Sequence, residues 1–329
     1  MKMKTYFPYY LFFCLFNPFL VTAQQFGFYG MHQKNWHIIN PAAPNLAFIQ
    51  TNKAENILNL SYRQQWIGLR GSPSNSNAHF ETMVIDSREK LNIKYGFGLY
   101  GETIGALQNN TLYFNYAYPI TIKSSRRFRS KSKLYIGFNA GYLQQRINFA
   151  NERFADGIDE TIESVIKEQK LFGGQSFFEL SPGLFFTNGE NFYMGLSSPR
   201  LIRTGQIGGS LKVINTQPQA HFILGTYNKD RTIQPSMWLR WQSNIDYQSI
   251  IKNNPISATF NFKSQISQSL TLGLGVSTGR WVHFEGGWQL RDNNGSEKPL
   301  QISFGYDLPF YKTGLNLGQT AEMNFVFFF

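Results

Sequence analysis

The chain has 329 residues, a formal net charge of +11 and a single cysteine. This length is enough to bury a large core, whereas one cysteine excludes an internal disulfide and a zinc site built from several thiolates. Aromatic residues make up 16% of the chain, yet the mean hydropathy is only −0.30. Many aromatic residues without net hydrophobicity indicate that apolar and polar residues alternate along the chain.

Residues 1–23 have the features of a secretory signal peptide. They begin with basic residues, continue in an apolar stretch to Val21 and end in small residues at Ala23. A membrane anchor is the alternative, but Asn17 and Pro18 interrupt a stretch that is already short for a span. We expect cleavage after Ala23, which also removes the cysteine.

The mature sequence favours strands over membrane-spanning helices. It contains no apolar run of roughly 18 residues, which such a helix needs. Period-two alternation dominates instead, as in residues 269–277, where Leu270, Leu272, Leu274 and Val276 alternate with Ser269, Thr271, Gly273, Gly275 and Ser277. A soluble sandwich also alternates, but its polar faces usually carry many Lys and Glu, whereas these are rich in Gly, Ser, Asn and Gln. Aromatic residues also gather near strand ends, as in the girdles of a membrane barrel.

The alternating segments predict about fourteen strands, an even number as in bacterial barrels. Their spans are 57–67, 77–85, 92–101, 111–119, 133–149, 176–187, 191–198, 219–228, 235–245, 256–266, 269–278, 281–290, 299–309 and 319–329. We therefore predict an all-β, transmembrane antiparallel β-barrel over residues 57–329. Residues 24–56 are expected to form a short amino-terminal periplasmic segment that plugs the lumen, because several inward positions are bulky. The longer connections, 150–175, 198–218 and 246–255, are expected to face the cell exterior.

The segment 58–66 carries a cation among aromatic residues. Leu58, Leu60, Tyr62 and Trp66 share one parity, with Gln64 as the exception, and Asn59, Ser61, Arg63 and Gln65 share the other. An inward Arg63 avoids the cost of roughly 2–4 kcal/mol for an arginine at the lipid midplane. We expect Arg63 and Gln65 to tie the amino-terminal segment to the lumen wall. In 237–242 the same parity predicts that Arg240 also points inward.

The connection 150–175 is acidic and its middle has the pattern of one amphipathic helix. Such a helix is commonly a solvated loop cover, and the alternative is a partner-binding surface in which Glu160 and Glu163 are the candidates.

The last residues alternate Phe325, Phe327 and Phe329 with smaller or polar residues. An amphipathic last strand that stops on Phe resembles the signal read by the barrel-insertion machinery. A buried strand of a soluble domain is the alternative, but so many terminal aromatic residues would be an aggregation hazard there.

Composition gives little support to nucleic-acid binding or catalysis. The basic residues are scattered and the chain is exported, so we expect no nucleic-acid partner. None of the histidines forms a recognised metal-ligand spacing, and no nucleotide or hydrolase motif occurs, so no metal or other cofactor is expected. His283 and Glu285, with a serine such as Ser277 or Ser303, imitate a membrane hydrolase. A hydrogen-bond network in the lumen explains them more simply, and we expect no enzyme activity.

Two motifs resemble the PorP/SprF family of Bacteroidetes outer-membrane proteins. The first is Asn40, Pro41 and Ala42, which follow a short aromatic and polar segment. The second is Tyr-Arg-x-Gln-Trp-x-Gly followed by Gly-x-Pro, here Tyr62, Arg63, Gln65, Trp66, Gly68, Gly71 and Pro73. The resemblance covers essentially the whole mature chain.

The resemblance implies a barrel of the type IX secretion system in the outer membrane. It implies that the protein helps to secrete a partner protein, or anchors it at the cell surface, through its outward loops and the barrel mouth. Partners in this family are often large adhesins. For this chain we also expect type IX secretion components, outer-membrane lipid and the barrel-insertion machinery as partners. The alternative is an outer-membrane channel or transporter for hydrophobic or small polar solutes.

Overall fold

A computed structural model of the whole chain describes residues 29–46, 56–85, 92–122, 132–147, 175–188, 191–207, 210–214, 219–227, 233–242, 256–267, 269–278, 281–291, 297–309 and 318–329. The helical elements are η1 (His32–Lys34) and α2 (Trp36–Ile39). The strands are β1 (Asn56–Gln64), β2 (Ser74–Ile85), β3 (Asn92–Ile104), β4 (Leu107–Ile122), β5 (Ser132–Ile147), β6 (Gln175–Thr187), β7 (Phe192–Ser197), β8 (Ile202–Ile207), β9 (Ser210–Ile214), β10 (Gln219–Thr226), β11 (Ile233–Gln242), β12 (Ile256–Gln265), β13 (Leu270–Ser277), β14 (Trp281–Arg291), β15 (Glu297–Pro309) and β16 (Thr320–Phe328).

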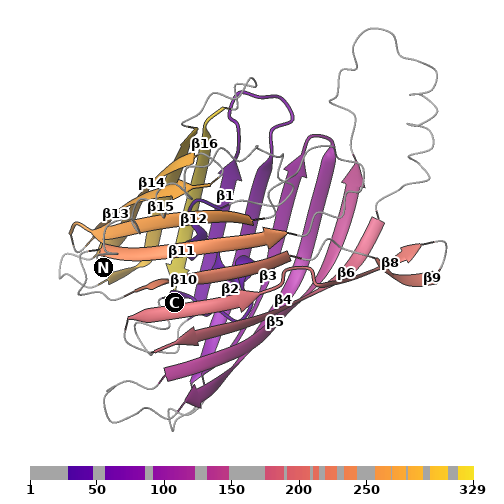
Figure 1. Cartoon of the computed structure of the whole chain (residues 1–329), viewed down its shortest axis with the longest axis horizontal. Coiled ribbons are helices and arrows are strands. Elements are labelled where there is room, and N and C mark those ends of the chain that lie inside the picture. Colours follow the sequence, from indigo (N-terminus) through magenta and orange to yellow (C-terminus); the bar gives the residue numbers. More distant parts are fainter. Residues whose placement is uncertain are drawn as a thin grey trace, which may run out of the picture.

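The strands form one antiparallel sheet that closes on itself (Figure 1). Strand β1 pairs with β2 on one side and with β16 on the other, and β5 pairs with β6 to complete the ring. The seam between β1 and β16 continues past the strand ends, because Asn56 and Phe329 exchange two backbone hydrogen bonds of 2.8 and 3.0 Å. Of the sixteen strands, β8 and β9 lie outside the main ring, so fourteen strands make the barrel. This confirms the predicted fold class.

Residues 198–218 were predicted to be an outward connection without strands, and this is wrong, because they contain strands β8 and β9. Strand β7 pairs with residues 183–187 of β6, and β8 pairs with residues 177–180 of the same strand. The two are thus one path along β6, interrupted at residues 198–201. Pro199 has no N–H to give to the ladder, and Arg200 adopts a positive φ of 52°. The chain therefore turns out of register and resumes pairing as β8, with β9 as its hairpin partner.

Side-chain burial is inverted relative to a soluble protein. In β1 the inward Asn59, Ser61 and Arg63 are buried, whereas the outward Tyr62 is 51% exposed. The buried set of the described residues is rich in polar and charged side chains, and many large apolar side chains are exposed. This is the pattern of a barrel with a polar interior and an apolar outer face. Arg240, in β11, is buried on the inward face as predicted.

The first two strand boundaries differ from the prediction. Strand β1 ends at Gln64 rather than at residue 67, because Trp66 (φ 50°), Gly68 (φ 95°) and Gly71 (φ 70°) adopt left-handed conformations that end the ladder. Trp66 therefore belongs to a loop and not to the outward row of β1. Strand β2 begins at Ser74 rather than at residue 77, since its first outward residues, Ser74 and Ser76, are polar like the inward Asn75 and hide the alternation.

Among the residues that the structure describes, no helix is both long and apolar enough to cross a membrane.

Candidate functional site

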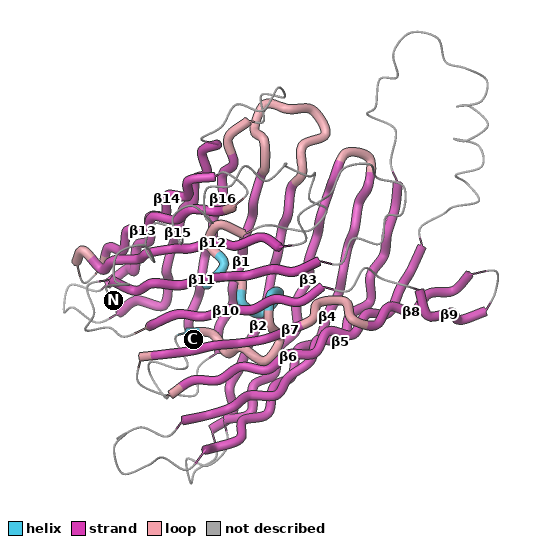
Figure 2. Tube along the Cα trace, in the orientation of Figure 1, coloured by secondary structure: helices cyan, strands magenta, loops and turns pink. Residues whose placement is uncertain are grey.

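Residues 29–46 lie inside the ring of strands, where Figure 2 shows their short helices. At one end of the segment, the Gly30 N–H donates to Glu322, near the start of β16 and the β1–β2 loop. At the other end, the Asn45 N–H donates to Glu81 Oε1 at 2.8 Å, near the opposite end of β2. The segment therefore runs along the barrel axis and is bound at both ends by inward carboxylates.

Arg63 is central to the first of these contacts. Its guanidinium donates to Asp307 Oδ2 at 2.6 Å and to Glu322 Oε2 at 2.9 Å, with all three side chains buried. Glu322 also accepts hydrogen bonds from the N–H groups of Gly30 and Met31 and from the Asn35 amide. One carboxylate thus joins the wall strand β1 to the amino-terminal segment. Since a buried charge is stable only when paired and hydrogen-bonded, each member of this group depends on the others.

His283 extends the same network. Its Nδ1 lies 2.5 Å from Asp307 Oδ1, and its Nε2 lies 3.9 Å from Glu285 Oε2. Gly30 packs directly on this ring, because a Cβ at Gly30 would lie 2.4 Å from the His283 Nδ1. A residue with a side chain does not fit there without displacement. His283 therefore contributes to the hydrogen-bonded lumen network that the sequence favoured over a hydrolase site.

Asn40, Pro41 and Ala42 pack directly against glycines of β5, β6 and β7, and we call this contact the glycine seat. The Asn40 amide donates to the Leu184 carbonyl at 2.9 Å, and Asn40 Oδ1 accepts the Ala42 N–H at 2.9 Å. A Cβ at Gly183 would come within 2.3 Å of Asn40 Oδ1. Cβ atoms at Gly137 and Gly195 would also lie under 3.0 Å from this tripeptide. The motif is therefore held by close backbone approach, which only glycine permits.

Lys94 fixes the turn that follows this seat. Its Nζ donates to the carbonyls of Pro41 at 3.1 Å and Ala43 at 2.6 Å, and lies 3.5 Å from Glu81. Asn115 donates to the same Pro41 carbonyl at 3.0 Å. Glu81 also accepts the Asn45 N–H. Both members of the Lys94–Glu81 ion pair therefore form hydrogen bonds with the backbone of residues 29–46.

His37 docks the middle of the segment against β2 and β5. Its Nε2 lies 2.7 Å from the Asn77 amide nitrogen, and its ring stacks on His79 at a centroid distance of 4.0 Å. Asn139 donates to the His37 carbonyl at 3.1 Å. Burial, with the neighbouring His79 and Lys94, lowers the pKa of His37 well below its usual value. The ring is therefore neutral at pH 7 and accepts the Asn77 hydrogen bond.

Aromatic contacts and two hydrogen bonds hold the remaining face of the segment. The Trp36 ring meets Tyr193 edge-on at 4.5 Å and Phe185 at 5.4 Å. Gln33 donates to the Tyr193 hydroxyl at 2.9 Å, and Ser197 donates to the Ile39 carbonyl at 2.6 Å. A cluster of buried aromatic residues from β3 to β11 surrounds these contacts. Aromatic packing therefore dominates the interior on the side of β3 to β11, and ion pairs dominate it on the side of β15, β16 and β1.

The two motifs that resemble the PorP/SprF family lie partly in the lumen and partly in the β1–β2 loop. Arg63 and the Asn40–Ala42 tripeptide both belong to the lumen network. Gln65 lies beyond β1, where its backbone N–H donates to the Pro73 carbonyl at 2.8 Å. The remaining motif residues form or flank the β1–β2 loop, namely Tyr62, Trp66, Gly68, Gly71 and Pro73. Of the predicted pair of ties, Arg63 is therefore the one whose side chain reaches the network that holds the segment.

Two other predicted sets remain untested. Glu160 and Glu163 lie outside the described residues. Phe325 and Phe327 lie in β16, and Phe329 follows it with 65% exposure, but insertion by the cellular machinery is not a property of the folded barrel.

Several residues of this network were not singled out from the sequence, chiefly Glu81, Lys94, Asn115, Gly183 and Glu322. Their inward parity within predicted strands was the available signal. It gave no indication of which inward residues meet the amino-terminal segment, since that depends on the closure of the barrel.

None of the described residues forms a group of three or more His, Cys, Asp or Glu side chains suited to a metal ion.

Comparisons with known proteins give one sequence match and several distant fold matches. The model of the family described as type IX secretion system membrane protein PorP/SprF matches residues 21–327. No curated protein matches the sequence. The CymD monoaromatic hydrocarbon channel is 8% identical with a TM-score of 0.49, covering 92% of this chain and 94% of that one. The TodX deltaS2S3 mutant monoaromatic hydrocarbon channel is 11% identical with a TM-score of 0.46, covering 89% and 93% respectively.

Proposed function

Since the chain belongs to the PorP/SprF family of type IX secretion system membrane proteins, we propose that it is a non-enzymatic outer-membrane barrel that helps to secrete a partner protein or anchors it at the cell surface. In this proposal residues 1–23 are the signal peptide, residues 24–56 close the lumen, and residues 57–329 form the barrel. The long connections at the β1–β2 loop end face the cell exterior.

The observation that carries this proposal is the attachment of residues 29–46 to the lumen wall. Hydrogen bonds to buried Glu322 at one end and to buried Glu81 and Lys94 at the other hold the segment, and close contacts with Gly137, Gly183 and Gly195 hold Asn40 to Ala42. A pathway for solutes would need this segment to leave, which would take the N–H groups of Gly30, Met31 and Asn45 away from Glu322 and Glu81. It would also take the carbonyls of Pro41 and Ala43 away from Lys94. Buried charges are costly to leave without their hydrogen-bond partners. A closed lumen favours a binding function on the outer loops over diffusion of solutes.

Conductance distinguishes this proposal from the channel alternative. The purified barrel is reconstituted in planar bilayers beside a variant that lacks residues 29–46. We expect the wild-type protein to show no steady conductance and the deletion variant to form open pores. Steady solute conductance by the wild-type protein, equal to that of the deletion variant, would support a channel and contradict a closed lumen. Heat-modifiable migration of both proteins on gels checks that each barrel is folded.

The nature of the partner follows from the same proposal. A secreted cell-surface protein, such as a large adhesin, binds the outer loops, and the acidic segment 150–175 with Glu160 and Glu163 is the first candidate surface. Type IX secretion components and the barrel-insertion machinery are the other expected partners.

A further inference from the structure

Strand β9 is the one strand in the described part of the chain that pairs with a single neighbour. Every other strand described there has at least two partners, because the ring closes on itself. Closure of a barrel normally removes all free strand edges, which would otherwise pair with other chains. Among the described strands, nothing pairs with the edge of β9 that faces away from β8, so this edge presents free backbone N–H and C=O groups.

The β8–β9 hairpin is held at its root, where it leaves the ring. Strand β8 pairs with residues 177–180 of β6, and the Arg203 Nε donates to Glu179 Oε1 at 2.8 Å. The Arg200 Nε lies 3.2 Å from Glu179 Oε2, and the Arg200 N–H donates to Ser181 Oγ at 2.8 Å. The position of the free edge is therefore fixed before any partner arrives, which lowers the entropic cost of binding.

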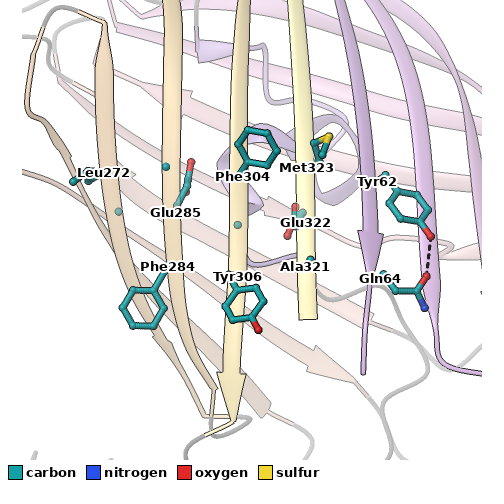
Figure 3. Close-up of a pocket in the computed structure, with 13 residues that line it drawn as sticks. Tyr62, Gln64, Leu272, Phe284, Glu285, Phe304, Tyr306, Ala321, Glu322 and Met323 are labelled. Carbon is teal, nitrogen blue, oxygen red and sulfur yellow. Dashed lines mark hydrogen bonds between the residues drawn. The ribbon is translucent and has the colours of Figure 1, made fainter. Parts of the chain in front are cut away.

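The hairpin lies at the β1–β2 loop end of the barrel, where Figure 1 shows it projecting from the ring. Strand β6 begins where β5 ends, and Gly105 in the adjoining β3–β4 turn donates its N–H to Gly71 in the β1–β2 loop. Over the ring itself the outward face is apolar, as Figure 3 shows for Leu272, Phe284 and Phe304. Hydrocarbon offers no partner for free backbone groups, so an open strand edge does not occur at that level. The free edge of β9 therefore lies in water, on the side that the proposed function places outside the cell.

Two residues of β9 direct their backbone N–H groups to the free edge. Residues of an antiparallel strand alternate between bonding to the neighbour and pointing away from it. Ser210 is paired with Ile207 across a two-residue connection, and the residue after such a connection donates its N–H back to the residue before it. Ser210 and every second residue after it therefore bond to β8, whereas Leu211 and Val213 present their N–H and C=O groups to the free edge.

We propose that the free edge of β9 binds an extended segment of the secreted partner protein, which adds to the sheet as a further strand. Only another extended backbone supplies donors and acceptors at the spacing of a strand edge, so this edge selects a polypeptide over a lipid or a solute. The inference rests on the proposed function, since the added strand comes from the secreted partner. It adds the place on the barrel and the mode by which that partner is bound.

Photocrosslinking from β9 on intact cells tests this proposal. The only cysteine of the chain, Cys14, lies in the expected signal peptide, so Lys212→Cys provides a single thiol for benzophenone-4-maleimide. After irradiation, mass spectrometry of the purified barrel identifies the adducts. Leu211→Pro and Val213→Pro, each added to Lys212→Cys, remove one N–H from the free edge and keep the pairing with β8, because an edge position of this kind tolerates proline. Leu211→Ala is the matched control, since it keeps the N–H.

We expect an adduct with one secreted cell-surface protein in Lys212→Cys and with the added Leu211→Ala, and about tenfold less of it with either proline variant. Heat-modifiable migration checks that each barrel is folded. An adduct of equal yield in the proline variants would overturn the proposal. An adduct with a second copy of the barrel, or with no other protein, would overturn it as well.

A pull-down of the tagged barrel separates failure of this inference from failure of the proposed function. Equal recovery of one secreted protein by the wild-type barrel and by both proline variants would leave the proposed function standing and rule out the β9 edge as the binding site. Recovery of no secreted protein by the folded wild-type barrel would contradict both.

Discussion

At the scale of single residues, Arg63 explains how an arginine is accommodated in a strand that otherwise alternates aromatic and polar side chains. It points into the lumen and is 3% exposed, yet both of its carboxylate partners come from strands near the end of the chain. Glu322 in turn accepts hydrogen bonds from the backbone N–H groups of Gly30 and Met31, and so links Arg63 to the amino-terminal segment. The charge is therefore part of the closure between the first and last strands as well as the anchor of the segment.

Replacement of Arg63 by Ala is expected to destabilise the barrel by about 3–5 kcal/mol, because Asp307 and Glu322 are left buried without their cation. Gln65→Ala is the matched comparison, since Gln65 uses its backbone N–H in the β1–β2 loop and a change of under about 0.5 kcal/mol is expected. Urea unfolding in detergent micelles, followed by tryptophan fluorescence, measures both. Equal losses in the two variants would contradict the central role of Arg63.

At the scale of elements, the segment 29–46 and the wall strands are fitted to each other. The short helix α2 presents Trp36 to β6 and β7, and the Asn40–Ala42 turn enters a space that Gly137, Gly183 and Gly195 leave open. These glycines are inward, where a barrel strand would ordinarily place a polar side chain. Glycine is needed at these positions because the Asn40–Ala42 turn packs against them, and the strand geometry itself does not require it.

Gly183→Ala is expected to loosen this fit, because the new Cβ would lie 2.3 Å from Asn40 Oδ1 and 2.9 Å from Pro41 Cδ. Overpacking of this kind typically costs about 1–3 kcal/mol. Hydrogen exchange of residues 29–46 measures the effect, with faster exchange expected. Gly286→Ala, whose Cβ meets no atom within 4 Å, is the control and should leave exchange unchanged. Unchanged exchange in Gly183→Ala would refute the seat.

Strand β16 allows a test of the predicted insertion signal. Phe329 joins Asn56 through backbone atoms, and its side chain is 65% exposed. Phe329→Ala is therefore expected to lower the amount of folded barrel in outer membranes while leaving the unfolding of assembled barrel unchanged. Trp288→Ala removes an outward aromatic of similar exposure, 60%, away from the chain end. If both variants assemble equally well, the terminal Phe is not read as a signal.

At the scale of the whole molecule, the lumen, the outward face and the β1–β2 loop end of the barrel differ in what they could bind. Residues 29–46 lie within the ring of strands, and many large apolar side chains face outward. In the proposed function, the connections at the β1–β2 loop end are the ones that bind a partner. Fourteen strands alone do not choose between a channel and an anchor. The occupied lumen makes the loop end the expected functional surface.

Deletion of residues 150–175 is expected to abolish recovery of one large secreted protein in a pull-down of the tagged barrel from detergent-solubilised outer membranes. Mass spectrometry identifies the recovered proteins. Replacement of residues 123–131 by a short Gly-Asn turn is the control, because that connection joins β4 to β5 at the opposite end of the barrel. Loss of the partner in both variants, or in neither, would argue against the acidic segment as the binding surface.

The sequence by itself determined the strand content, the inward and outward parity and the direction of Arg63 and Arg240, because period-two alternation is a local property of each strand. It misplaced the end of β1 and missed β8 and β9, since positive-φ turns and the interruption at Pro199 break that alternation. Only the tertiary structure decided which inward residues meet residues 29–46. Lys94, Glu81, Gly183 and Glu322 lie far apart in the chain, and closure of the ring brings them around one segment.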